Sequence, residues 1–256
     1  MIVNNLRGLM GRAMADTIPG DAVRDASGSI KLARVPKHTF RAHIVEGLRE
    51  AILGGDIPPG APIVEMSLAA QFGVSRGPLR EAIRQLIEEG LLVTVPYTGT
   101  RVIDLSVEDV REIYSMRIAL EIFAFEQVWD RRDDAFRREL TRRHDLLTAS
   151  IDAGDDRNSI LAELGLHCFV YEAARHRLLL HVWQSLSGRL QLYWAAHHRA
   201  HAMRGPRRDG HDSYVAAAVG DDLEVMRTEI RTHMLRGAAQ TEQFLSEFEA
   251  ASRQAS

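Results

Sequence analysis

Two short amphipathic helices separated by a Gly-Val-Ser turn are predicted between Ser67 and Gly90. Ser67 is expected to cap the first helix, and Gly73 to end it because glycine readily adopts positive φ. Ser75 is expected to cap the second helix, whose apolar residues recur at intervals of three and four. Helices joined by so short a turn cross at a large angle, so the second helix projects its first turns from the domain, as a DNA-recognition helix must.

Three arginines flank the apolar stripe of this second helix: Arg76, Arg80 and Arg84. A row of arginines on a helix is usually only a solvated face. Arg84 lies more than two turns into the helix and has the further alternative of an ion pair with Glu81 or Glu88. In the context of a helix-turn-helix, however, the row predicts contacts with DNA.

A β-hairpin is predicted directly after the second helix. Residues 91–95 are apolar and β-branched, residues 96–99 are typical of a turn, and residues 100–103 return as a second strand. Upstream, an amphipathic helix stops at Gly54 and is followed by a turn rich in proline and glycine. This order of elements predicts a winged helix-turn-helix.

The overall charge does not explain an affinity for DNA. The 256-residue chain has a formal net charge of -3, and residues 37–103 carry seven Lys or Arg against seven Asp or Glu. Phosphate binding must therefore come from a local cluster of basic residues.

The single cysteine, Cys168, excludes an intrachain disulfide and fits a reducing cytoplasm. The sequence contains neither an apolar run long enough to span a membrane nor a secretory signal, so we expect no membrane partner and a cytoplasmic location.

The remainder of the chain predicts a mainly α protein in three parts. Residues 1–36 form an N-terminal extension without a sustained period, expected to be poorly ordered, although an arm that touches DNA or a partner subunit is an alternative. Residues 37–104 form the winged helix-turn-helix, and Asp104-Leu105 is the linker. Residues 105–250 read as about six helices with no strand pattern, which indicates an all-α bundle.

Three histidines and one carboxylate in the bundle suggest a metal site. A Glu and a His four residues apart share one face of a helix, and two later histidines could complete the site. The candidates are Glu163, His167, His211 and His233. The spacing is weak by itself, because His197 and His201 form a rival pair at the same separation and polar residues often occupy a partly buried helix face.

The N-terminal pattern is similar to a known family. The segments LREAILGGDIPPG and LAAQFGVSRGPLREAIRQLIEEGLL, with the wing Gly99, resemble the DNA-binding domain of the GntR family of bacterial transcription regulators over roughly residues 38–104. The resemblance implies that Ser75 begins the recognition helix, that Arg76 and Arg80 contact the operator, and that Gly99 lies near the minor groove.

The helical part resembles the FCD effector domain of the FadR subgroup of that family. Many such domains bind a divalent ion, commonly zinc or nickel, through an Asp four residues before a His and two further His. The resemblance implies a site at His167, His211 and His233, with Glu163 in place of the usual Asp; zinc is the expected ion, with nickel or manganese as alternatives. It also implies that Arg117 helps to bind a small carboxylate effector, the alternative being a salt bridge with Glu121.

These inferences together predict a DNA-binding regulator without catalytic residues. A homodimer is expected to bind double-stranded palindromic operator DNA as a repressor and to be released by a small organic acid bound at the metal-containing cavity. Two alternatives use the same histidines: a metal-dependent enzyme, and a sensor whose only ligand is the metal ion.

Overall fold

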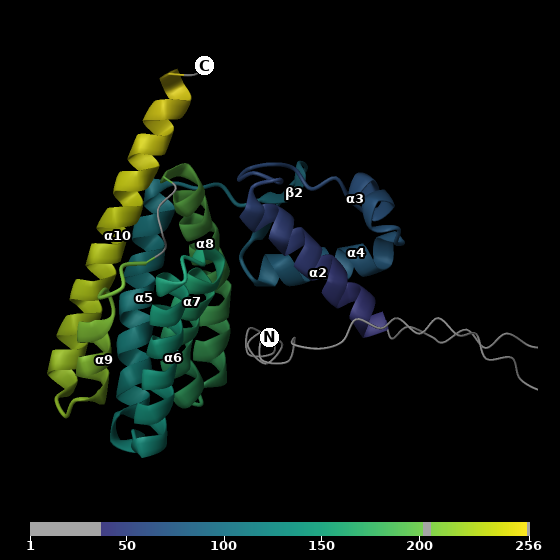
Figure 1. Ribbon diagram of the computed structural model, residues 1–256. Helices are drawn as coiled ribbons and strands as arrows, with labels where there is room; N and C mark the ends of the chain where they lie inside the picture. Colours follow the sequence, from purple (N-terminus) through teal and green to yellow (C-terminus); the bar gives the residue numbers. More distant parts are fainter. Residues whose placement is uncertain (1–36, 202–205, 255–256) are drawn as a thin grey trace, which may run out of the picture.

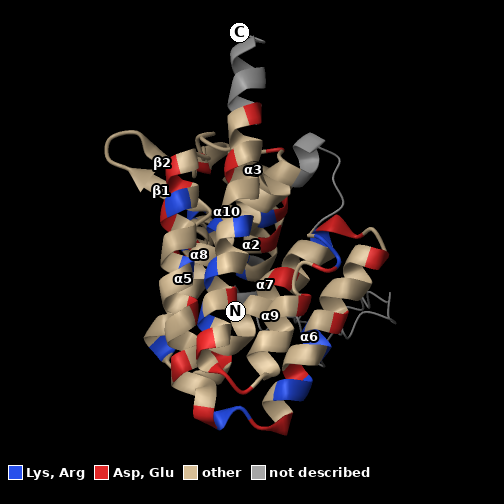
Figure 2. Ribbon diagram, turned by 90° about the vertical axis from the view of Figure 1, so that its left-hand side faces the viewer, with Lys and Arg blue, Asp and Glu red and all other residues tan. Residues whose placement is uncertain are grey.

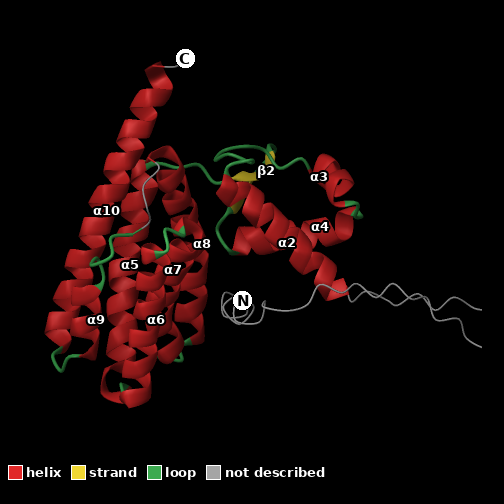
Figure 3. Cartoon of the chain, in the orientation of Figure 1, coloured by secondary structure: helices red, strands yellow, loops and turns green. Residues whose placement is uncertain are grey.

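The computed structural model describes residues 37–201 and 206–254, with side chains described for 41–197 and 206–247. The predicted N-terminal extension, residues 1–36, lies outside the described residues. The described chain is mostly helical and contains one small sheet of two strands (Figure 3). The predicted fold class, a winged helix-turn-helix followed by an all-α bundle, is confirmed.

Three helices form the N-terminal region: α2 (Lys37–Gly54), α3 (Glu65–Phe72) and α4 (Arg76–Glu88). The apolar stripe of α4 is buried against α2 through Leu79, Ala82, Ile83 and Leu86. Gly73 ends α3 with a φ of 63°, as expected. The predicted cap at Ser67 is wrong, because the N-cap of α3 is Val64, three residues earlier. Ser75 is the N-cap of α4, although its side chain makes no capping hydrogen bond.

The predicted hairpin is present within one residue of its expected bounds. Strands β1 (Leu92–Val95) and β2 (Gly99–Val102) pair antiparallel, with Leu92 opposite Val102 and Val95 opposite Gly99. Gly99 has a φ of 94°, a conformation that a side chain would strain. The turn therefore needs glycine at the position that the sequence singled out.

Six α-helices and one 3-10 turn make up the rest of the described chain. They are α5 (Val107–Val128), η1 (Trp129–Arg131), α6 (Asp134–Asp152), α7 (Asp156–Ala173), α8 (Arg177–His201), α9 (Asp212–Val219) and α10 (Leu223–Gln254). Ser106 begins α5 by accepting a hydrogen bond from the Asp109 amide at 3.0 Å. The helices pack side by side around one apolar core, and the last turns of α10 extend beyond their neighbours (Figure 1).

The surface of the bundle carries charges of both signs. Acidic and basic residues are interspersed along its helices (Figure 2). None of the helices in the described ranges is long and apolar enough to cross a membrane.

Helix α8 belongs to both parts of the molecule. Leu192 is fully buried in the core of the N-terminal region, although α8 otherwise packs in the bundle. A Cβ atom added at Gly188 would lie 1.8 Å from the carbonyl oxygen of Glu89, and one added at Gly90 would lie 2.3 Å from that of Ser185. The backbone at the end of α4 therefore rests directly on the backbone of α8, which only glycine at both positions allows.

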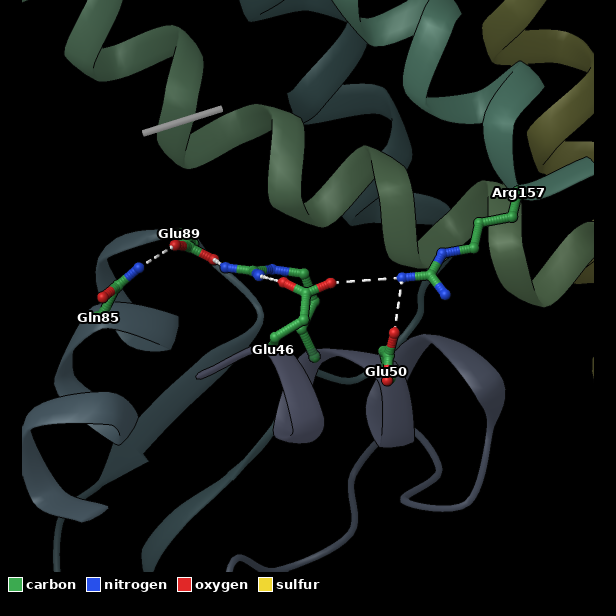
Figure 4. A network of polar contacts seen from close by, with 6 residues as sticks. Glu46, Glu50, Gln85, Glu89 and Arg157 are labelled. Carbon is green, nitrogen blue, oxygen red and sulfur yellow. Dashed lines mark hydrogen bonds and ion pairs between the residues drawn. The ribbon is translucent and has the colours of Figure 1, made fainter. Parts of the chain in front are cut away.

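A polar network spans the same junction. Arg157, at the start of α7, donates to Glu50 at 3.0 Å and to Glu46 at 3.3 Å, both on α2. Arg49 of α2 contacts Glu46 and donates to Glu89 at 2.7 Å (Figure 4). The end of α4, helix α2 and helix α7 are thus linked by one chain of ion pairs.

Candidate functional site

One face of α4 is exposed and carries the predicted DNA-contacting residues. Ser75, Arg76, Arg80 and Arg84 are all exposed, whereas the opposite face is buried in the core. Because the three arginines follow one another at one-turn intervals, they form a single row along this surface. The arrangement leaves the row free to approach a DNA groove.

Arg80 is held by a neighbouring helix. Its Nε atom donates to Glu65 of α3 at 2.8 Å, and both side chains remain partly solvent-exposed. The alternative predicted for Arg84 is not observed, since no ion pair joins it to Glu81 or Glu88 within the described residues. Gly99 lies in the exposed turn of the wing.

Three of the predicted metal residues meet inside the bundle. His167 comes from α7, His211 is the N-cap of α9, and His233 comes from α10. One ring nitrogen of each lies within 4.8 Å of the corresponding nitrogens of the other two. Residues separated by 66 positions in the sequence are therefore brought together by the packing of three helices.

The environment of His167 and His233 favours neutral imidazole rings. Burial lowers the pKa of His167 well below its usual value and lowers the pKa of His233 to about 2, and in both cases the charge of Arg117 acts in the same direction. A neutral imidazole keeps one lone pair, which is the form that binds metals. Nε2 of His167 and both ring nitrogens of His211 are buried without a hydrogen-bond partner.

Glu163 lies beside the histidine cluster. Its Oε1 atom is 3.3 Å from Nε2 of His211, but the carboxylate is not among the atoms that lie within 4.8 Å of one another. Burial alone would raise the pKa of Glu163, but His211, His167 and Arg117 outweigh that effect and lower it. The carboxylate of Glu163 thus lies next to the three nitrogens.

Three residues that sequence reasoning missed surround His167. Glu121 of α5 is fully buried, and its Oε1 atom lies 2.9 Å from Nδ1 of His167. Tyr214 and Tyr171 donate to the same carboxylate at 2.6 and 3.3 Å. The sequence offered one signal for this group, because Glu121 is an acid on the apolar face of a predicted helix and buried acids are rare without a partner.

Arg117 is buried and lacks an ion pair. It is 2% exposed, and its Nε and Nη2 atoms have no hydrogen-bond partner. The predicted alternative, an ion pair with Glu121, is absent from the part of the chain that the structure describes. The guanidinium carbon instead lies 5.2, 5.5 and 5.8 Å from the ring centroids of Tyr114, Trp183 and Trp194. Aromatic faces attract a cation but do not satisfy its N–H donors.

A cavity of about 360 Å³ connects these groups. Arg117, Glu163, His211 and His233 line it together, and aromatic and polar side chains of α8 and α10 complete its wall. A cationic guanidinium and histidine nitrogens therefore face one space, which suits an anionic ligand with polar substituents.

The rival histidine pair and three further residues of the bundle lie in different places. His197 lines the cavity and packs against Phe244, whereas the side chain of His201 lies outside the described residues. Trp194 lines the cavity, but Tyr193 instead anchors the backbone of Ser106, and His176 accepts from the amide of Leu179 at 3.2 Å.

The histidine cluster fits a borderline divalent ion. Neutral imidazole nitrogens suit zinc, nickel and related ions better than calcium or magnesium, which prefer oxygen ligands. With metal–nitrogen distances of about 2.0–2.1 Å, two nitrogens on one ion lie at most roughly 4.2 Å apart. The three histidine nitrogens lie up to 4.8 Å apart, so small side-chain movements would let them bind one ion.

Two family profiles match the chain in the order of its two parts. Residues 40–102 match the profile described as "Bacterial regulatory proteins, gntR family", and residues 112–236 match the FCD domain. The first match covers the helix-turn-helix and wing, and the second includes His167, His211 and His233.

Curated relatives carry regulatory names. The chain is 32% identical over 153 residues to a probable D-xylose utilization operon transcriptional repressor of Paenarthrobacter nicotinovorans, covering 60% of this chain and 67% of that protein. It is 27% identical over 184 residues to the gluconate operon transcriptional repressor of Bacillus licheniformis, covering 70% of this chain and 75% of that protein.

Solved structures share the fold. McbR/YncC of E. coli superposes with a TM-score of 0.65 at 21% identity, covering 80% of this chain and 97% of that one. A GntR regulator from Rhodococcus sp. RHA1, described as putative in its title, gives 0.64 at 24% identity, covering 79% and 97%. Together with the matched profiles and relatives, the described geometry leads to one conclusion: the chain belongs to the GntR family of bacterial regulatory proteins and carries an FCD domain after its winged helix-turn-helix.

Proposed function

We propose that this protein is a transcriptional repressor that binds double-stranded operator DNA through α4 and the wing. The observation that carries the proposal is the exposed row of arginines on α4, opposite a buried apolar face, in a domain of a DNA-binding family. The names of the curated relatives support repression. The DNA-contacting residues are Ser75, Arg76, Arg80, Arg84 and Gly99.

The buried cluster is proposed to hold a divalent ion, with zinc first and nickel or manganese as alternatives. His167, His211 and His233 supply three ring nitrogens, and Glu163 lies beside them as the carboxylate in the place where the resemblance expects an Asp. A bound ion would supply a positive centre at the wall of the cavity. The unpartnered buried nitrogens support this assignment, because such atoms are costly when nothing binds them.

The effector is proposed to be a small carboxylate that contacts Arg117. A buried guanidinium without an ion pair is unfavourable, so an anion that enters the cavity offsets that cost. The volume of about 360 Å³ suits a small acid better than a long acyl chain. Since two relatives are named for gluconate and D-xylose operons, sugar acids belong in the first set of ligands to test.

Helix α8 is proposed to transmit effector binding to the DNA-binding region. Trp194 of α8 lines the cavity, while Gly188 of the same helix rests on the end of α4. A ligand that shifts α8 must therefore shift α4 or break this contact. A differential affinity of the effector for the two arrangements would change operator affinity by the same factor, typically 1–3 kcal/mol.

A homodimer is proposed as the operator-binding species, acting in the cytoplasm where the operator lies. One winged helix contacts too few bases for specific binding, and a dimer presents two recognition helices to the two halves of a palindrome. Met116 and Phe123, seven residues apart on one face of α5, are 46% and 39% exposed and offer an apolar surface to a second copy.

The decisive experiment combines DNA binding with ligand turnover. An operator is first selected from a promoter library with the zinc-loaded protein, and fluorescence anisotropy then follows its release by gluconate, other sugar acids and dicarboxylates. A repressor releases the operator and returns the acid unchanged. Catalytic loss of the acid without DNA would support the enzyme alternative, and release by zinc or a chelator alone would support a metal sensor. Failure to select any DNA sequence would contradict the proposed function.

A further inference from the structure

Glu121 is a buried carboxylate at which three side chains converge. It is 0% exposed and lies on α5, where its neighbours along the helix face the apolar core. Its Oε1 atom lies 2.6 Å from the hydroxyl of Tyr214 and 2.9 Å from Nδ1 of His167, and its Oε2 atom lies 3.3 Å from the hydroxyl of Tyr171. Burying a carboxylate is costly unless its acceptors are satisfied in this way.

The nearby Arg117 favours the charged form of this carboxylate but makes no ion pair with it. No ion pair joins Arg117 to Glu121 among the described residues, although the two are four positions apart on one helix. The partners of Glu121 come instead from α7 and α9, which also carry His167 and His211. The carboxylate is therefore directed at the histidine cluster rather than at the cation on its own helix.

The contact with His167 selects one form of its ring. Nδ1 of His167 is the ring nitrogen that faces Oε1 of Glu121, where it can carry the ring proton and donate it to that oxygen. In a neutral ring the lone pair is then on Nε2. Nε2 is the atom that is buried without a hydrogen-bond partner, and the ring that carries it lies 5.3 and 5.2 Å from the rings of His211 and His233.

We infer that Glu121 is a positioning residue that fixes the tautomer and ring orientation of His167 for metal binding. Tyr214 assists, because its hydroxyl shares Oε1 with His167 and its ring lies 4.9 and 5.5 Å from the rings of His167 and His233. Outer-shell carboxylates of this kind orient metal-binding histidines generally. This inference rests on the proposed metal site and adds a residue that does not touch the ion.

The test measures zinc affinity and the tautomer of His167 in the full-length protein. Chelator competition gives the zinc affinity of wild type, Glu121→Gln, Tyr214→Phe and Tyr171→Phe, and nitrogen-15 histidine spectra of the metal-free proteins report the tautomer. His167→Gln identifies the His167 signal by its loss. We expect Glu121→Gln to weaken zinc binding by roughly 10- to 100-fold and to populate the other tautomer. Tyr214→Phe should have a larger effect than Tyr171→Phe.

Glu126→Gln is the matched control, because Glu126 is an acid on the same helix that pairs with Arg227 at the surface. It should leave zinc affinity and tautomer unchanged. A purely structural role for Glu121 would lower thermal stability without moving the tautomer, and that result would overturn the inference. Wild-type zinc affinity in Glu121→Gln would also overturn it while leaving the metal site intact. If the wild type itself binds no zinc, nickel or manganese, the proposed site fails and the inference fails with it. Tyr214→Phe provides the same readouts if Glu121→Gln does not fold.

Discussion

The arginines of α4 and Arg117 of α5 are the same side chain in opposite environments. Arg80 is 59% exposed and pairs with Glu65 at the surface, whereas Arg117 is 2% exposed and has no ion pair. Water solvates the first charge, so removing it from the free protein costs little. Burying the charge of Arg117 costs free energy, and an anionic ligand that binds next to it would offset that cost. The two regions should therefore respond differently to equivalent substitutions.

The largest effect is expected when histidines of the buried cluster are replaced. Replacing two of the three clustered nitrogens, as His211→Ala with His233→Ala, should weaken zinc binding by more than the roughly 10- to 100-fold typical of outer-shell changes. Elemental analysis and chelator competition measure this loss. His144→Ala is the matched control, because His144 contacts Asp212 outside the cluster. One tightly bound zinc per chain in the double variant would contradict the assignment.

Arg117→Met should weaken ligand binding more than it changes stability. The substitution removes the cost of burying a guanidinium, but it also removes a cation that favours the charged forms of Glu121 and Glu163. The two effects oppose each other, so the thermal midpoint of the ligand-free protein should move by only a few degrees, since 1 kcal/mol corresponds to about 2–4 °C for a domain of 150–250 residues. The same change should weaken binding of the acid effector by about 2–5 kcal/mol, because the ligand anion loses its buried partner. Calorimetry measures both effects. A lower midpoint with unchanged effector affinity would assign Arg117 a structural role.

Arg80→Ala should weaken DNA binding without changing stability. Operator affinity should fall by about 1–3 kcal/mol if Arg80 contacts a guanine, while the thermal midpoint and the zinc content stay unchanged. Arg84→Ala is the internal comparison and should have a smaller effect, because Arg84 lies farther from the start of α4. Anisotropy with the selected operator measures both variants. Unchanged operator affinity in Arg80→Ala would remove the central DNA-binding assignment.

The smallest effect is expected where the two regions meet. A methyl group at Gly188 would overlap the carbonyl oxygen of Glu89, so Gly188→Ala should separate α4 from α8. Zinc binding should persist, whereas the change in operator affinity caused by the effector, about 1–3 kcal/mol for typical coupling, should shrink. An unchanged effector response would show that the signal does not pass through this contact.

Much of the local structure followed from residue patterns. The stripe of α4, its arginine row and the hairpin were confirmed because each depends on neighbours within a few positions. The cap at Ser67 was wrong because the loop before α3 is held by pairing with the wing: the amide of Ile63 donates to the carbonyl of Thr100 at 2.8 Å. A distant strand thus set the start of that helix.

The candidate metal site was only partly predictable. The resemblance named three histidines that the structure brings together, but Glu163 lies outside their closest group and Glu121 was considered only as a partner for Arg117. Spacing along one helix shows which side chains share a face, but it does not show which groups of other helices they meet. The roles of Tyr171 and Tyr214 depend entirely on such contacts.

The sequence by itself determined the two-part architecture and the exposed arginine row of α4, because periodicity, caps and turn residues act over short distances. Only the tertiary structure decided what surrounds Arg117, which ring nitrogen of His167 lacks a hydrogen-bond partner, and where the two parts touch. Leu192 and Gly188 have no local signature, yet they join α8 to the DNA-binding region. Burial and long-range contacts arise when helices pack together, and the free energy of a buried charge depends on that packing.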